Sequence, residues 1–96
     1  SPFEVEATLV LHPAVLEAAV IGVVDADGLT RPKACVVLKD PAQASDGLSD
    51  ELKRFVKQRL APHKYPRAVE FLPELPKTAT GKIQRFRLRE REARRA

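Results

Sequence analysis

Apolar and polar residues alternate in blocks along this chain, and three of the blocks have the spacing and composition of β-strands. Residues 18–24 and 33–39 are short runs, apolar on both faces, which predicts strands that are buried on both sides. The turn-forming sequence Asp-Ala-Asp-Gly at 25–28 lies between them, so we expect the two strands to be antiparallel neighbours. A third strand is predicted over 68–72.

Helix signals flank these strands. Residues 1–4 combine an N-cap serine, a proline suited to the first helical position and a glutamate that completes a capping box, so we expect a helix that begins here and ends before Pro13. A second helix is expected to begin at residues 49–51, with acids at its positive end, and to stop at 61–62. A charged third helix is predicted over 86–95. The second helix carries one apolar stripe, at Leu52, Phe55, Val56 and Leu60.

Together these elements predict an α+β domain in which a small three-stranded, mainly antiparallel sheet is flanked by helices. A chain of 96 residues makes one small domain with a modest core, which is too little for a complete two-substrate enzyme. The chain contains no methionine, and we interpret it as a piece of a longer polypeptide. No apolar run approaches the length of a membrane span and no segment resembles a signal peptide, so we expect no membrane contact.

Residue types that bind metals or form disulfides are scarce. The single cysteine, Cys35, fits a reducing cytoplasm, and we expect an inert core thiol because it lies within an apolar run. With two His, one Cys and no clustered spacing, no metal site is predicted. His12 precedes Pro13 at the expected end of a helix, where a capping or surface role is favoured over catalysis.

The net charge of +4 is distributed unevenly. Residues 1–47 carry three basic and seven acidic side chains, whereas residues 48–96 carry fourteen basic and six acidic ones. The second half therefore has a positive field suited to an anionic partner, such as nucleic acid or a nucleotide-bearing cofactor like coenzyme A. A solvated basic surface without a ligand is the alternative. The arginines of 85–95 alternate with two glutamates, which is typical of a solvated helix, with nucleic-acid contact as a lesser alternative.

The segment 76–83, Pro-Lys-Thr-Ala-Thr-Gly-Lys-Ile, places a glycine beside a lysine in a Thr-rich turn. Gly81 can adopt backbone angles closed to other residues, and Lys82 offers a compact cation with three donors for a carboxylate or phosphate oxygen. The segment is not a phosphate-binding P-loop, because Pro76 stands where the first glycine belongs and Ile83 where the magnesium-binding hydroxyl belongs. An ordinary solvated turn is the alternative.

A second candidate is the basic run His63-Lys64-Tyr65-Pro66-Arg67. Pro66 stiffens the backbone, and a tyrosine ring among cations suits stacking on a base together with contact to a phosphate. Two structural alternatives remain open. The run could be a rigid connection between a helix and a strand, and Tyr65 could be a core ring with an exposed hydroxyl.

The segment 76–83 resembles the C-terminal lysine motif of the adenylate-forming superfamily, which includes acyl-CoA synthetases, luciferases and peptide-synthetase adenylation domains. The sequences of 60–67 and 78–86 are most similar to those of benzoate- and hydroxybenzoate-type CoA ligases. Three further segments resemble the same superfamily in the same order, so that the matches span nearly all of the chain: 1–6, 15–22 and 31–37.

This resemblance implies that residues 1–96 are the C-terminal mobile domain of a cytoplasmic carboxylate–CoA ligase, inactive when isolated, beginning just after the family's hinge residue. The ATP, acid and Mg²⁺ sites would lie in an N-terminal domain outside this chain, and that domain would be its partner. Lys82 would serve the adenylation step, with Gly81 shaping its turn. Contacts to coenzyme A would come, by position, from the second candidate segment: His63, Lys64, Tyr65 and Arg67.

The resemblance also implies the substrates: ATP, coenzyme A and a small carboxylate, expected to be benzoate or a related aromatic acid. Two other function classes stay open. An adenylation domain that serves a carrier protein would keep Lys82 but would meet a protein-borne thiol. A small basic nucleic-acid-binding module would need base-stacking aromatics, and the five aromatic residues, spread along the chain, supply few. We therefore expect no nucleic-acid partner.

Overall fold

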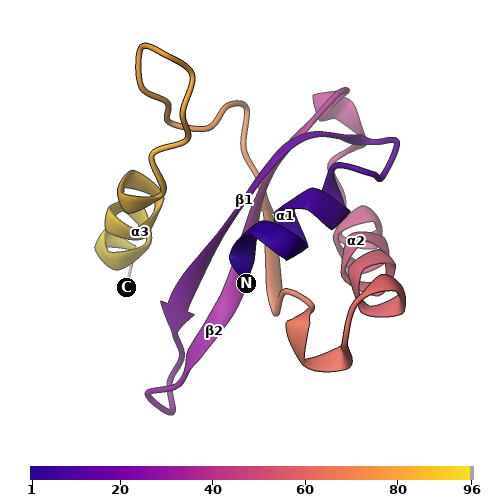
Figure 1. Cartoon of the computed structure of the whole chain (residues 1–96), viewed down its shortest axis with the longest axis horizontal. Helices are drawn as coiled ribbons and strands as arrows, with labels where there is room; N and C mark the ends of the chain where they lie inside the picture. The colour runs from indigo at the N-terminus through magenta and orange to yellow at the C-terminus, as the bar shows by residue number, and fades with distance from the viewer. Residues whose placement is uncertain (96) are drawn as a thin grey trace.

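The computed structural model describes residues 1–95 and has an α+β fold, as the sequence predicts (Figure 1). Two short 3₁₀ segments, Pro41–Gln43 and Pro62–Lys64, lie on either side of α2 in the sequence. In chain order the helices and strands are α1 (Pro2–Leu9), β1 (Val15–Val24), β2 (Thr30–Leu38), α2 (Asp46–Arg59), β3 (Ala68–Phe71) and α3 (Arg85–Arg94).

The three strands form one sheet in the order β1-β2-β3. β1 and β2 are antiparallel neighbours from Val15 opposite Leu38 to Val24 opposite Thr30, which confirms the predicted pairing. β3 is parallel to β2, because the chain returns through α2 before it adds the third strand. The sheet is therefore mixed, and the longer of its two ladders is antiparallel.

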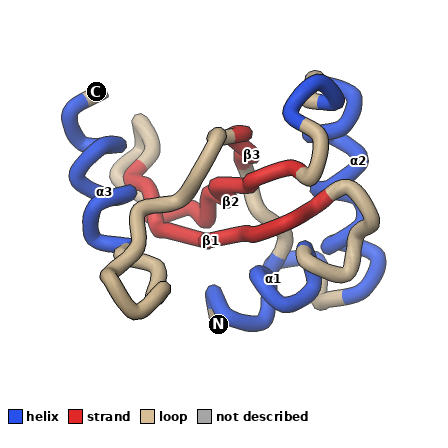
Figure 2. Tube along the Cα trace, turned by 90° about the horizontal axis from the view of Figure 1, so that it is seen from above, coloured by secondary structure: helices blue, strands red, loops and turns tan. Residues whose placement is uncertain are grey.

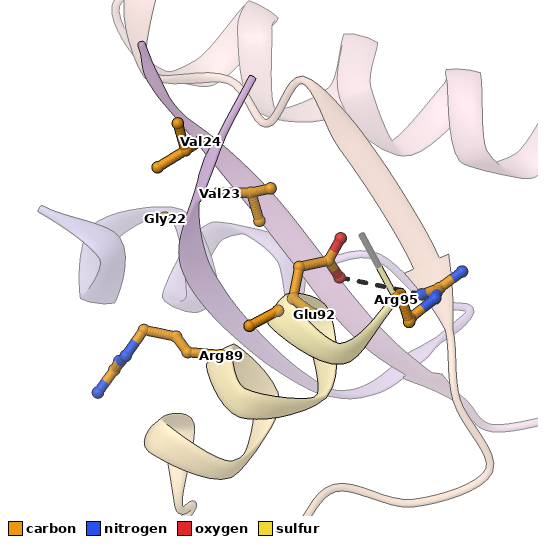
Figure 3. A pocket seen from close by; sticks show the side chains of 7 residues that line it. Gly22, Val23, Val24, Arg89, Glu92 and Arg95 are labelled. Atoms are coloured by element: carbon orange, nitrogen blue, oxygen red, sulfur yellow. Dashed lines mark ion pairs between the residues drawn. The ribbon is translucent and has the colours of Figure 1, made fainter. Parts of the chain in front are cut away.

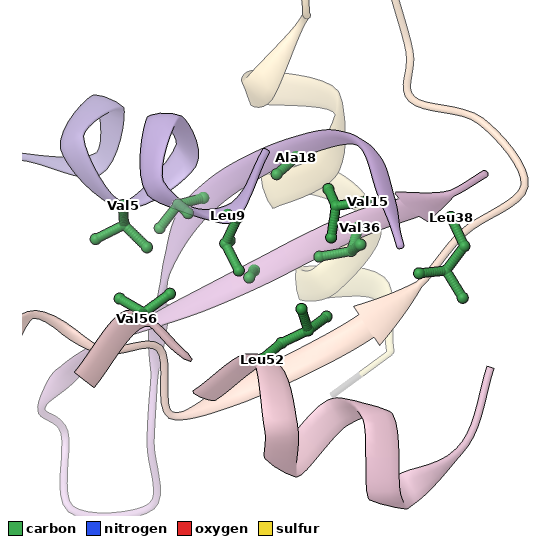
Figure 4. Packing of buried hydrophobic residues seen from close by; sticks show 10 residues of the cluster. Val5, Leu9, Val15, Ala18, Val36, Leu38, Leu52 and Val56 are labelled. Carbon is green, nitrogen blue, oxygen red and sulfur yellow. The ribbon is translucent and has the colours of Figure 1, made fainter. Parts of the chain in front are cut away.

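Helices cover both faces of the sheet, which explains why the strands are apolar on both sides. α1 and α2 lie on one face, and α3 lies on the other together with the segment that precedes it (Figure 2). The first face holds the larger cluster, in which the α2 residues Leu52 and Val56 meet Val36 of β2 (Figure 4). On the second face Leu75 and Leu88 pack on Cys35. Burial raises the pKa of the Cys35 thiol, and this agrees with the expected inert core residue.

One predicted helix start is wrong, and at another the position is confirmed but the predicted capping box is absent. α2 begins at Asp46, about one turn before residues 49–51, because the Ser45 hydroxyl accepts the Leu48 N–H at 3.0 Å and acts as the N-cap. In α1, Ser1 makes no side-chain cap bond and no capping box forms, since the Glu4 carboxylate pairs with a distant lysine instead. Each antiparallel strand also begins three residues earlier than its apolar run suggests.

His12 is a buried structural residue. Its side chain accepts the Ala14 N–H through Nδ1 at 3.1 Å and pairs with Glu51 through Nε2, while its ring meets Phe55 edge to face. Neither expected role is found, because α1 ends at Leu9 with Val10 as its C-cap and only 7% of His12 is exposed.

Part of the uneven charge of the sequence is paired inside the fold. Acidic side chains of the first half form ion pairs with basic side chains of the second half, and the reverse also occurs: Glu4–Lys64, Glu6–Arg85, Glu17–Lys77, Lys33–Glu70 and Lys33–Glu92. The prediction of a solvated third helix holds for most of its residues but not for the side that faces the sheet. Arg91 and Arg95 both donate to Glu70 on β3, so one side of α3 is fastened to the sheet.

None of the helices within residues 1–95 has the length and apolar character needed to cross a bilayer.

Candidate functional site

Lys82 lies in a short hairpin that projects from the domain between Leu75 and α3 (Figure 1). Its two arms meet as an antiparallel bridge between Lys77 and Ile83. The Thr78 N–H donates to the Lys82 carbonyl at 2.8 Å, and the Lys82 N–H donates to the Thr78 hydroxyl at 3.0 Å. Gly81 closes the turn with a φ of +89°, in the region that only glycine occupies without strain. The sequence expectation for Gly81 is therefore confirmed.

The ammonium group of Lys82 is exposed and free for a ligand. Within residues 1–95 no carboxylate lies within ion-pair distance of its Nζ, whereas Lys77 in the same hairpin pairs with Glu17 of β1 at 2.8 Å. An exposed cation on a backbone held by its own hydrogen bonds suits contact with an anion brought from outside the domain.

Both arms of the hairpin are anchored in the body of the domain. On the incoming side Leu75 is buried in the second apolar cluster, and on the outgoing side Ile83 packs against the same cluster. Arg85, at the start of α3, donates through Nε and Nη2 to the buried carboxylate of Glu6 on α1. This carboxylate raises the pKa of the Arg85 guanidinium, so that the arginine stays charged.

The segment 63–67 follows α2 and carries the four side chains predicted to meet coenzyme A. Its backbone is fixed by the buried Pro66 and by the Arg67 N–H, which donates to the Pro32 carbonyl at 2.9 Å. Lys64 is half-buried and pairs with Glu4 at 3.3 Å. The segment is therefore a rigid connection, as one of the alternatives proposed, and still presents polar groups to solvent.

The four side chains do not converge on one point. His63 and Lys64 line a cleft that neither Tyr65 nor Arg67 lines. The Tyr65 ring packs against the first apolar cluster, and Lys57 Nζ lies 5.2 Å from its centroid. Arg67 is exposed. Tyr65 thus has the partly buried position of a core ring, which was the structural alternative for this residue.

The cleft beside His63 has a volume of about 510 Å³, and its lining combines basic and apolar side chains. Four basic or titratable side chains, from the 63–67 segment and α3, surround an apolar floor from α1 and the sheet. The first group is His63, Lys64, Arg85 and Arg89, and the floor includes Val5, Val20, Ile21 and Pro32. Sequence reasoning assigned the two arginines to a solvated helix. No local signal connects them with His63, because more than twenty residues of sequence separate them from it.

A second cleft, of about 570 Å³, lies between the end of β1 and α3 (Figure 3). Its only acid, Glu92, pairs with Lys33 at 2.6 Å and lies 3.9 Å from Arg95. None of the predicted site residues lines this cleft, so we do not connect it with the motif. Within residues 1–95 no three side chains of the His, Cys, Asp or Glu type are grouped to hold a metal ion.

The fold and the glycine–lysine hairpin define a known class of domain. Residues 4–82 match the AMP-binding enzyme C-terminal domain family, and the chain belongs to this family. The match ends at Lys82, the residue that the motif singles out.

The similarity to known enzymes extends over most of this chain. It is 60% identical over 89 residues to the benzoate–CoA ligase of Thauera aromatica, which covers 93% of the chain and 17% of that enzyme. It is 50% identical to 4-hydroxybutyrate–CoA ligase 1 of Metallosphaera sedula, over 95% of the chain and 16% of that enzyme. A solved benzoate CoA ligase from Burkholderia xenovorans LB400 superposes with a TM-score of 0.86 at 64% identity, over 93% of the chain and 18% of the solved one. The chain therefore spans about a sixth of the length of these relatives.

Proposed function

We propose that this chain is the C-terminal domain of an ATP-dependent carboxylate–CoA ligase. The observation that carries the proposal is an exposed lysine that has no ion-pair partner among residues 1–95. It lies on an anchored hairpin in a member of the AMP-binding enzyme C-terminal domain family. In the proposed reaction, a carboxylate oxygen attacks the α-phosphorus of ATP, which gives an acyl-adenylate and pyrophosphate. The thiol of coenzyme A then attacks the acyl carbon, so that a C–S bond forms and AMP leaves.

Lys82 is the proposed catalytic residue of the first step. Negative charge accumulates there on the attacking carboxylate and on the phosphate oxygens, and a positioned cation lowers the energy of that transition state. Removing one such group typically costs about 3–4 kcal/mol, or roughly 10²–10³ in rate. The remaining parts of the reaction, including the ATP, acid and Mg²⁺ sites, are proposed to lie in an N-terminal domain that is this chain's partner.

The second step is proposed to use another face of the same domain. His63 and Lys64 in the basic cleft, Tyr65 with its neighbouring cation, and the exposed Arg67 are the proposed contacts for coenzyme A. Their spread over the surface suits an extended nucleotide rather than a compact anion. Because Lys82 lies in a hairpin apart from these groups, the proposal requires the domain to rotate between the two steps.

We propose benzoate or a related aromatic acid as the substrate. The support is similarity to two benzoate–CoA ligases, at 60% and 64% identity. The ligase from M. sedula is named for 4-hydroxybutyrate, and the acid pocket is proposed to lie outside this chain, so this part of the proposal depends on the absent domain.

The test uses the full-length enzyme with ATP and Mg²⁺, and measures AMP release with a panel of acids that includes benzoate, 4-hydroxybenzoate and 4-hydroxybutyrate. Thioester formation is measured with free coenzyme A and, separately, with a carrier protein that bears a phosphopantetheine thiol. We expect AMP release with the aromatic acids and a thioester only with free coenzyme A. Thioester formation only on the carrier protein would identify an adenylation domain that serves a carrier protein instead of a CoA ligase. Faster AMP release with 4-hydroxybutyrate than with the aromatic acids would overturn the proposed substrate class.

A further inference from the structure

Glu6 is a buried carboxylate that joins three parts of the fold. Only 8% of the residue is exposed. Its Oε2 accepts the Val20 N–H of β1 at 2.7 Å and the Arg85 Nε at 2.9 Å, while its Oε1 accepts Arg85 Nη2. β1 is an edge strand, so the Val20 N–H has no partner on a neighbouring strand, and the Glu6 carboxylate accepts its hydrogen bond instead.

The partner of Glu6 stands close to Lys82 in the chain. Only Ile83 and Gln84 separate Lys82 from Arg85, and the Gln84 N–H is itself bonded to the Pro76 carbonyl at 2.8 Å. A two-pronged contact between guanidinium and carboxylate fixes orientation as well as distance. Because so little chain lies between, a shift of Arg85 has to be transmitted to the outgoing arm of the hairpin.

A second ion pair also anchors the hairpin, but its side chains are more exposed to solvent. Lys77 of the incoming arm and Glu17 of β1 form the more exposed pair, with side chains that are 33% and 28% exposed, against 25% for Arg85 and 11% for Glu6. Exposed pairs hold geometry loosely, because solvent and side-chain freedom compete with them. The position of Lys82 is therefore set mainly from the Arg85 side.

We propose that Glu6 and Arg85 are positioning residues for Lys82 in the adenylation step. This inference rests on the proposed function, since it has meaning only if Lys82 acts on the reacting groups. Glu6 lies 76 residues before Lys82 in the sequence and holds it through Arg85, without touching substrate. A misplacement of about 1 Å can cost roughly 10²-fold in rate, so loss of the contact is expected to slow adenylation about ten- to a hundredfold.

The test uses the full-length enzyme with Glu6→Gln, and separately with Arg85→Lys. The lysine keeps the positive charge but cannot donate from two nitrogens as the guanidinium does. Arg91→Lys is the matched control, because Arg91 makes the same kind of two-pronged contact, with Glu70, further along α3. Carboxylate-dependent ATP–pyrophosphate exchange reports adenylation, and thioester formation from a synthetic acyl-adenylate reports the second step. We expect Glu6→Gln and Arg85→Lys to lower the kcat of exchange while the KM for ATP changes little. Glu6→Gln should leave the second step unchanged. Arg91→Lys should leave exchange unchanged.

A double-mutant cycle with Lys82→Ala separates positioning from a general loss of structure. If Glu6 acts through Lys82, Glu6→Gln has no further effect on exchange once Lys82 is alanine. An equal loss in both backgrounds, or an equal loss in both half-reactions, overturns the inference and makes Glu6 a stability residue. If thermal unfolding shows that Glu6→Gln lowers the folded fraction, the same double-mutant cycle is made with Arg85→Lys and Lys82→Ala. That cycle then decides whether the Glu6–Arg85 contact acts through Lys82.

The two proposals can fail separately. If Lys82→Ala leaves exchange intact, the proposed role of Lys82 is wrong and the positioning role falls with it. If Lys82→Ala removes exchange but neither Glu6→Gln nor Arg85→Lys lowers it, only the positioning role is wrong.

Discussion

The Lys82 hairpin and the segment 63–67 both precede a regular element, but their side chains are used differently. In the hairpin, backbone hydrogen bonds and the Glu6–Arg85 pair fix the chain, and the Lys82 ammonium is left exposed. In 63–67 the backbone is fixed by a buried proline, and two of the side chains are engaged inside the domain. Lys64 pairs with Glu4, and Tyr65 packs on the core.

The proposed function gives this one small domain two steps with different demands. A transition-state contact needs one cation whose position is set by its surroundings, because a fixed group requires no reorganisation during the reaction. Binding of an extended nucleotide requires only several modest contacts, and these can be shared with structural roles. We therefore expect substitutions around the hairpin to change rate, and substitutions in 63–67 to change affinity.

The largest effect on stability is expected for Glu70→Gln, which tests whether α3 is held to the sheet by charge. Glu70 accepts from Arg91 and Arg95 and pairs with Lys33, and the Arg91 hydrogen bond holds the pKa of its carboxyl well below the ordinary range. Loss of such charged hydrogen bonds costs about 1–3 kcal/mol in the free energy of unfolding. Glu74→Gln, at an exposed acid, is the control.

The same pair of variants predicts a pH dependence. A carboxyl whose pKa is lowered in the folded state stabilises the fold above its ordinary pKa, and that contribution is lost as the pH falls through its folded pKa. In urea unfolding, the difference between wild type and Glu70→Gln should be full at pH 7 and should shrink below about pH 4. A difference that stays constant down to pH 2 would show that the ion pairs at Glu70 contribute little.

A smaller effect is expected for Gly81→Ala, with Gly28→Ala as its counterpart in the β1–β2 turn. Both glycines have positive φ, +89° and +77°, and a Cβ at either would meet no atom within 4 Å, so each substitution acts through backbone strain alone. Each should cost about 1–2 kcal/mol of stability. Only Gly81→Ala should also slow ATP–pyrophosphate exchange, because only this turn carries Lys82. Equal exchange rates in the two variants would argue against a fixed hairpin.

The smallest effect is expected for Lys64→Gln. Its pair with Glu4 is partly exposed, so the free energy of unfolding should fall by less than about 1 kcal/mol. The KM for coenzyme A should rise while exchange is unchanged, and Lys53→Gln on α2, whose partner Asp50 is 4.0 Å away, should change neither. An unchanged KM would remove Lys64 from the proposed coenzyme A contacts.

Sequence patterns predicted what depends on local residues. The two-sided apolar strands, the buried Leu52 and Val56 of α2, and the glycine turn before Lys82 all follow from short-range spacing and steric freedom. The start of α2 was missed because Ser45 and Ser49 are equally good caps by composition, and only the folded chain shows which hydroxyl accepts a backbone N–H.

The supports of the site could not be predicted in the same way. Glu6 and Arg85 are 79 residues apart, and each lies in a segment whose own pattern indicates an ordinary helix. The arginines of α3 look solvated because a charged helix and a helix fastened by ion pairs have the same sequence pattern. Long-range pairing of charges is decided by the packing of the elements, which the local pattern does not contain.

The central claim is that Lys82 acts in adenylation and not in thioester formation. The most direct test compares Lys82→Ala with Lys77→Ala, a lysine of the same hairpin that already has a partner in Glu17, and measures both half-reactions in the full-length enzyme. We predict that Lys82→Ala lowers ATP–pyrophosphate exchange by roughly 10²–10³ and leaves thioester formation from acyl-adenylate intact, while Lys77→Ala retains both. Exchange in Lys82→Ala at the level of Lys77→Ala would contradict the account.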